Sequence, residues 1–112
     1  MKKYTSLKEF YPFYLTEHQN GISRTLHFVG TSLFLGILVY SLLNGEFKMI
    51  IYAPLCGYGF AWIGHFFFEK NKPATFTYPG FSLVSDFIMF WHIITRQLPN
   101  KLREAKKKLD SN

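Results

Sequence analysis

The chain of 112 residues is long enough for one domain, and its single cysteine excludes an internal disulfide and any cysteine-based metal cage. Apolar residues make up 48% of the chain and aromatic residues 20%, which is more than one small water-soluble core needs. The net charge is +6, and six of the 13 basic residues lie between Arg96 and Lys108. Next to apolar segments, such a cluster favours anionic lipid headgroups over nucleic acid as its partner.

The first predicted element is a short helix over about residues 7–18. Ser6, with Glu9 three residues later, matches a capping box at its start. Pro12 is awkward inside a continuous helix and favours a break near Phe10. The N-terminal stretch is basic, polar and aromatic, and it lacks the apolar centre and the small-residue cleavage site of a signal peptide.

Two long apolar segments follow, and each is predicted to be a helix that crosses a bilayer. The first covers about residues 22–43, with Asn20 or Ser23 as its N-cap. The second covers about residues 47–68, and Pro54 is expected to kink it.

A fourth helix is predicted over about residues 82–96. Its apolar run is short, so we expect it to be interfacial or re-entrant. A frayed helix is expected beyond Pro99. The sequence therefore indicates an all-α membrane helical bundle, with one membrane-embedded domain over residues 1–98 and a basic C-terminal tail over residues 99–112. One stripe of the fourth helix carries Ser82, Ser85, Asp86 and Met89.

The distribution of charge predicts the topology of this bundle. Lys48 is the only basic residue between the two crossings, whereas basic residues flank their outer ends. A two-crossing hairpin with both termini cytoplasmic satisfies the positive-inside tendency. We therefore expect an integral membrane protein, in the inner membrane of a bacterium or the endoplasmic reticulum of a eukaryote.

Histidines gather where the two crossings should meet. An antiparallel hairpin places the start of one crossing beside the end of the other, so His27 and His65 should lie at the same membrane surface. Glu69 lies one turn after His65, and the preceding loop returns His18 to this level. Imidazole and carboxylate ligands are typical of non-haem Fe(II) sites, although imidazole also suits zinc, copper and nickel. We therefore predict a metal site formed by His18, His27, His65 and Glu69.

Structural readings of these residues remain open. Taken alone, each histidine is more often structural than metal-binding, His27 could snorkel at the interface, and Glu69 could belong to a solvated loop. Asp86 is expected to orient a histidine rather than to bind the metal itself. His92 lies six residues from Asp86 and is expected to face elsewhere.

Two blocks resemble the fungal 2-hydroxy fatty acid dioxygenase family. They are FYPFYLTEHQNGISRTLHFVGT (residues 10–31) and GYGFAWIGHFFFEKNKPATFTYPGFSLVSDFIMF (residues 57–90). The resemblance implies an Fe(II)-dependent membrane enzyme of fatty acid α-oxidation, whose fungal member acts at the endoplasmic reticulum in the breakdown of phytosphingosine. It converts a long-chain 2-hydroxy fatty acid, with O2, to the fatty acid one carbon shorter. Histidines that are thought essential in that family correspond to His18, His27 and His65.

This resemblance leads to a hypothesis for the reaction. The carboxylate and 2-hydroxyl of the substrate are expected at the Fe(II) together with O2, and Arg24 could hold the carboxylate through a charge-assisted bond. Two other functions fit the same residues. His27 and His65 could be axial ligands of a haem in a membrane electron carrier, or the chain could be a non-catalytic membrane or lipid-binding protein.

Overall fold

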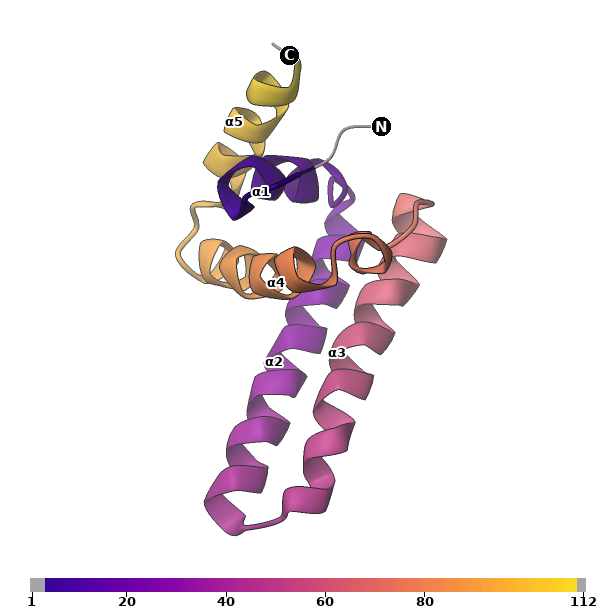
Figure 1. Ribbon diagram of the computed structural model, residues 1–112, viewed down its shortest axis with the longest axis vertical. Helices are drawn as coiled ribbons and strands as arrows, with labels where there is room; N and C mark the ends of the chain where they lie inside the picture. The colour runs from indigo at the N-terminus through magenta and orange to yellow at the C-terminus, as the bar shows by residue number, and fades with distance from the viewer. Residues whose placement is uncertain (1–3, 111–112) are drawn as a thin grey trace. The chain divides into compact units, whose positions relative to one another are not determined.

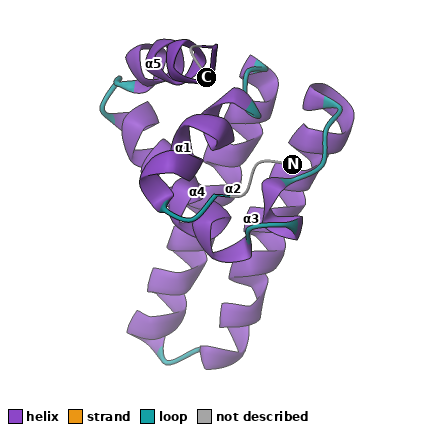
Figure 2. Ribbon diagram, turned by 45° about the horizontal axis from the view of Figure 1, so that its top comes forward, coloured by secondary structure: helices purple, strands orange, loops and turns teal. Residues whose placement is uncertain are grey.

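The computed structural model describes residues 4–110, and every regular element in this range is helical (Figure 2). This confirms the all-α prediction. The chain divides into two compact units. Residues 20–70 form the first, which we call the hairpin unit, and residues 4–19 with 71–110 form the described part of the second, which we call the aromatic unit.

The hairpin unit consists of two antiparallel helical arms that lie side by side (Figure 1). The side chain of Asn20 accepts hydrogen bonds from the backbone N–H groups of Ile22 and Ser23, so Asn20 and not Ser23 is the N-cap. Gly45 ends the first arm with a positive φ of 66°. The elements are α2 (Gly21–Asn44), the 3-10 helix η1 (Phe47–Ile51), α3 (Tyr52–Ile63) and the π-helix η2 (Gly64–Glu69).

The second arm changes helical type along its length. It was predicted as one helix over residues 47–68, but it passes from 3-10 to α and then to π geometry. Pro54 is the third residue of α3. Its missing N–H falls in the first helical turn, where amides lack intrahelical partners, and this position is compatible with proline. The change from 3-10 to α geometry comes two residues before Pro54.

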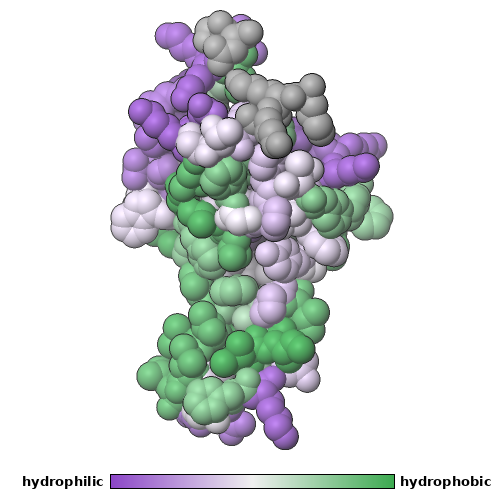
Figure 3. All heavy atoms as spheres, viewed as in Figure 1, coloured by the Kyte–Doolittle hydropathy of each residue, from purple (hydrophilic) through white to green (hydrophobic). Residues whose placement is uncertain are grey.

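Small residues line the contact between the two arms. A Cβ at Gly30 would lie 3.0 Å from the carbonyl oxygen of Gly57, which shows how closely the backbones approach. The large apolar side chains mostly face outward, and Figure 3 shows them gathered over the loop half of the hairpin. Two stretches of this unit, Gly21–Asn44 and Phe47–Glu69, are long and apolar enough to cross a membrane.

The aromatic unit packs three helices around large side chains. Its core contains Phe10, Tyr14, Leu15 and Met89, with Tyr4 and Tyr78 against its edge. Ring contacts connect these residues, such as Phe10 with Tyr78 at 5.2 Å between centroids. The elements are α1 (Leu7–Thr16), the 3-10 turn η3 (Ala74–Phe76), α4 (Pro79–Ile94) and α5 (Leu98–Asp110).

Helix α1 begins as expected but does not break. The Ser6 hydroxyl accepts a hydrogen bond from the Glu9 N–H at 3.3 Å, which confirms the N-terminal cap. The helix then continues through Pro12, so the predicted break near Phe10 was wrong. A proline inside a helix costs about 3 kcal/mol, through the lost backbone hydrogen bond and a steric clash with the preceding turn. Burial of Phe10 and Tyr14 in the aromatic core offsets this cost, since each such ring contributes about 1.5–3 kcal/mol.

The C-terminal half of the aromatic unit differs from the prediction at two places. Helix α4 begins at Pro79, three residues earlier than expected, because proline is favoured in the first turn. The basic segment after Pro99 is not frayed, since α5 is continuous from Leu98 to Asp110. Leu98 and Ala105 are buried in the same cluster as Phe10, so the apolar face of α5 is anchored in the core.

Candidate metal centre

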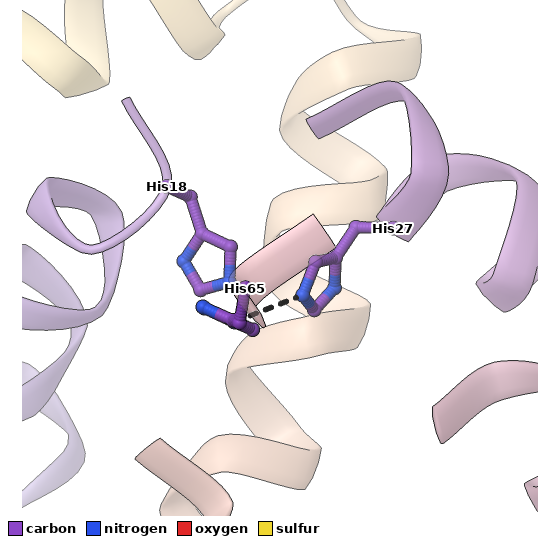
Figure 4. A group of neighbouring side chains, drawn as sticks. All are labelled: His18, His27 and His65. Atoms are coloured by element: carbon purple, nitrogen blue, oxygen red, sulfur yellow. Dashed lines mark hydrogen bonds between the residues drawn. The ribbon is translucent and has the colours of Figure 1, made fainter. Parts of the chain in front are cut away.

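His27 and His65 face each other inside the hairpin unit. Their Nε2 atoms lie 3.4 Å apart, and the rings are perpendicular with centroids 5.4 Å apart (Figure 4). Both side chains are buried, with exposed fractions of 5% and 2%. The meeting of these two histidines, predicted from hairpin geometry, is confirmed.

The local backbone explains why the pair can meet. His65 is the second residue of the π-helix η2, a rare geometry that is frequently found at functional sites. Just before it, Gly64 lies so close to Ser23 that an added Cβ would be 2.8 Å from the Ser23 Oγ. Ser23 is one turn before His27 on α2. The absence of a side chain at Gly64 therefore keeps the two arms close at the level of the histidines.

The separation of the two nitrogens suits one metal ion. At the metal–nitrogen distances of about 2.0–2.1 Å found in tetrahedral sites, two imidazole ligands are about 3.3–3.4 Å apart. The observed 3.4 Å matches that spacing. The two Nε2 atoms are within hydrogen-bonding distance, and the same separation would allow both to bind one ion.

His18 lies in the aromatic unit and has the protonation pattern of a metal ligand. Its Nδ1 is 2.7 Å from the carbonyl oxygen of Tyr14, and its ring packs on the Tyr14 ring with centroids 4.2 Å apart. A carbonyl oxygen only accepts, so Nδ1 carries the proton and Nε2 is the unprotonated nitrogen of the neutral ring. His18 is fully buried. Together, His18, His27 and His65 offer three imidazoles that could hold a metal ion.

Asp86 is connected to His18 through Tyr14. The Tyr14 hydroxyl donates a hydrogen bond to Asp86, and the same tyrosine holds the His18 ring through its carbonyl oxygen. Burial raises the pKa of Asp86 to about 7, while the Tyr14 hydrogen bond acts in the opposite direction. Burial and the neighbouring Asp86 raise the pKa of Tyr14 well above its usual value, so the hydroxyl stays protonated. Asp86 is thus hydrogen-bonded to Tyr14, a residue for which no role was predicted, and its role in orienting a histidine stays a prediction.

The sequence contained one signal for a role of Tyr14, namely its position one helical turn before His18. Tyr14 precedes His18 by four residues, but a tyrosine in an aromatic-rich helix gives no sign of a partner 72 positions away. His92 does face elsewhere, because its Nδ1 is hydrogen-bonded to the Tyr11 hydroxyl at 2.7 Å.

Glu69 and Arg24 have different surroundings. One carboxylate oxygen of Glu69 accepts the backbone N–H of Asn20 at 2.9 Å, which ties the end of the second arm to the start of the first. Among the described residues, Glu69 does not belong to the group of histidines whose ligand atoms are suited to a metal. Its role as a fourth ligand stays a prediction. Arg24 is half-buried three residues before His27, and its role towards a carboxylate also stays a prediction.

Comparison with known protein families matches residues 4–98 to the Mpo1-like family, described as 2-hydroxy-palmitic acid dioxygenase Mpo1-like. No curated protein and no solved structure matches the chain. The matched range contains the three histidines, Arg24, Glu69 and Asp86, and it ends where α5 begins. The family name implies dioxygenase activity on a 2-hydroxy fatty acid. The chain belongs to the Mpo1-like family.

Proposed function

We propose that the chain is a membrane-embedded, Fe(II)-dependent dioxygenase that converts long-chain 2-hydroxy fatty acids to the fatty acid one carbon shorter. The observation that carries this proposal is the buried pair of facing Nε2 atoms of His27 and His65. Both rings are buried in the hairpin unit, and the separation of their Nε2 atoms matches that of two imidazoles on one metal ion. Membership of the Mpo1-like family supplies the reaction class.

His18 is proposed as the third ligand, with Glu69 as a possible fourth. Only Gln19 separates His18 from Asn20, the N-cap of α2. His27 lies seven residues further, about 10 Å along the helix axis. The chain between His18 and His27 is therefore short, which supports a common site for these two histidines and for His65, the neighbour of His27. Iron held there would supply the redox chemistry that O2 activation requires.

The chain's own side chains would bind and orient the substrate. Arg24 is proposed to hold the substrate carboxylate, one turn from His27. Tyr14, kept protonated beside Asp86, would hold the His18 ring through its carbonyl oxygen and leave Nε2 to bind the metal. The apolar residues of the hairpin would accept the acyl chain and exclude water.

We further propose that α2 and the arm from Phe47 to Glu69 cross the bilayer, with both termini on the cytoplasmic side. Both stretches are long and apolar enough, and large side chains such as Leu43 and Phe67 are exposed on their outer faces. The basic residues that flank the outer ends support this orientation.

Metal content and product analysis test the proposed function. The full chain is purified anaerobically in mild detergent, loaded with Fe(II), and analysed for bound iron as wild type, His65→Ala and His92→Ala. We expect near-stoichiometric iron in the wild type and in His92→Ala, and none in His65→Ala. With 2-hydroxypalmitate and O2, the two iron-containing proteins should produce the acid one carbon shorter. Iron binding or turnover by His65→Ala at wild-type level would contradict the proposal.

A further inference from the structure

A cavity of about 510 Å³ opens among α1, α4 and α5 within the aromatic unit, which is in the size range of pockets that bind small ligands. Its wall is mainly apolar, with Leu7, Leu15 and Ile88 among the lining residues. None of its lining residues is among the proposed metal ligands. The cavity is therefore a feature distinct from the candidate metal centre.

The rim of this cavity is cationic. Lys8, Lys101 and Lys108 line it, and the only acidic lining residue is Glu104. Glu104 approaches Lys101 at 3.8 Å, and its side chain is 69% exposed, so it neutralises the rim only in part. A cavity lined by apolar side chains and by three lysines is complementary to a molecule with an anionic head and a hydrocarbon chain.

The basic helix α5 provides two of these lysines and holds them in place. Its apolar face is anchored in the core by Leu98 and Ala105, so it is not available for insertion into a membrane. Lys101 and Lys108 lie at the cavity, whereas Lys106 and Lys107 are exposed on the same helix outside it. Only part of the charge on α5 is therefore directed at the cavity.

We propose that this cavity binds one anionic bilayer phospholipid, with the phosphate at Lys8, Lys101 and Lys108 and an acyl chain along the apolar wall. A phospholipid is favoured over other anionic amphiphiles because the proposed insertion of the two long apolar helices into a bilayer, on which this choice rests, would place that lipid in excess around the chain. The bound lipid would attach the aromatic unit to the membrane surface. This inference does not depend on metal binding or catalysis.

The test compares two pairs of substitutions on one helix. The full chain in neutral detergent is titrated with phosphatidylglycerol, with phosphatidylcholine of the same acyl chains, and with palmitate, and binding is followed by native mass spectrometry. Lys101→Gln with Lys108→Gln should weaken phosphatidylglycerol binding about 30-fold, since each lysine near an anionic lipid is worth about a factor of five. Lys106→Gln with Lys107→Gln removes the same charge and should change binding less than about twofold.

Three outcomes would overturn the proposal. Equal losses in the two pairs would show attraction to the general charge of α5, and equal binding of phosphatidylcholine would show that the phosphate is not selected by the lysines. Tighter binding of palmitate than of phosphatidylglycerol would assign the cavity to a fatty acid. If the Lys101 and Lys108 double variant does not fold, judged by helical circular dichroism, Lys108→Gln alone gives the same comparison, with an expected loss of about fivefold.

Discussion

The two units of the molecule bury opposite kinds of side chain. The aromatic unit encloses its large residues, Phe10, Tyr14, Leu15 and Met89, each no more than 2% exposed. The hairpin unit exposes its large apolar residues and encloses small or polar ones. Those enclosed are Ser23, His27, Gly30, Thr31, Ser41, Ala53, Ala61, Gly64 and His65.

This difference supports the proposal that the hairpin unit crosses a bilayer. Burial of large apolar groups is the main stabilising term in water. Between helices in lipid that term is absent, and close contact through small residues takes its place. The comparison also makes the histidines informative. In an interior made mostly of Gly, Ala, Ser and Thr, the two facing imidazoles are the large side chains, which fits the proposed metal site.

The largest effect is expected from His65→Gln, which tests whether the buried histidines serve a ligand or the packing of the hairpin. The variant should lose iron and turnover completely, while the metal-free forms of variant and wild type should unfold within about 1 kcal/mol of each other. The measurements are iron content, product formation, and unfolding of the metal-free proteins in detergent. Strong destabilisation of the metal-free variant, with iron retained, would make His65 a structural residue.

Next comes a matched pair of large-to-small substitutions, one in each unit. Phe10→Ala should reduce the free energy of unfolding by about 3–5 kcal/mol, because it opens a cavity in a packed core. Leu43→Ala removes a side chain that is 80% exposed and should change the free energy of unfolding by less than about 0.5 kcal/mol. Thermal and denaturant unfolding in detergent measure both. A cost for Leu43→Ala as large as that for Phe10→Ala would contradict the division between the units.

Local signals in the sequence predicted much of this architecture. Apolar run length located the two arms, Asn20 was one of two expected caps, and hairpin geometry brought His27 to His65. These features depend on spacing along one or two helices, so periodicity and capping rules are sufficient.

Features that depend on distant packing were not predictable. The continuity of α1 through Pro12 follows from an aromatic core assembled with residues about 70 positions away. The π geometry at His65 is associated with the close approach of Gly64 to Ser23, which no local pattern encodes. The link from Asp86 to Tyr14 likewise joins two helices far apart in the sequence.

A smaller effect, dependent on pH, is expected from Asp86 in the aromatic unit. Its pKa is about 7 in the folded state against 3.8 when exposed, so the folded state binds more protons between these pH values. The contribution of this group to stability is therefore present below pH 4 and is lost as the pH rises towards 7. The full shift corresponds to about 4 kcal/mol as an upper bound.

Asp86→Asn should remove this dependence, because an amide does not titrate. Relative to wild type, the variant should become more stable as the pH is raised from 4 to 8, as measured by denaturant unfolding at several pH values. A difference between the two proteins that stays constant over this range would show that the carboxyl group is not protonated in the folded state.

The smallest expected effect comes from two glycine substitutions on α2, one at the contact between the two arms and one away from it. Gly30→Ala places a Cβ 3.0 Å from the Gly57 carbonyl oxygen and 3.1 Å from the Phe60 Cβ, so the arms must move apart. We expect a loss of about 1–2 kcal/mol. Gly36→Ala, on the same helix, meets nothing within 4 Å and should gain about 0.5–1 kcal/mol, since alanine is the better helix former. If Gly30→Ala lowers the free energy of unfolding in detergent and Gly36→Ala raises it, the close contact through small residues contributes to the stability of the hairpin. A gain in both variants would mean that the arms are not in close contact at Gly30.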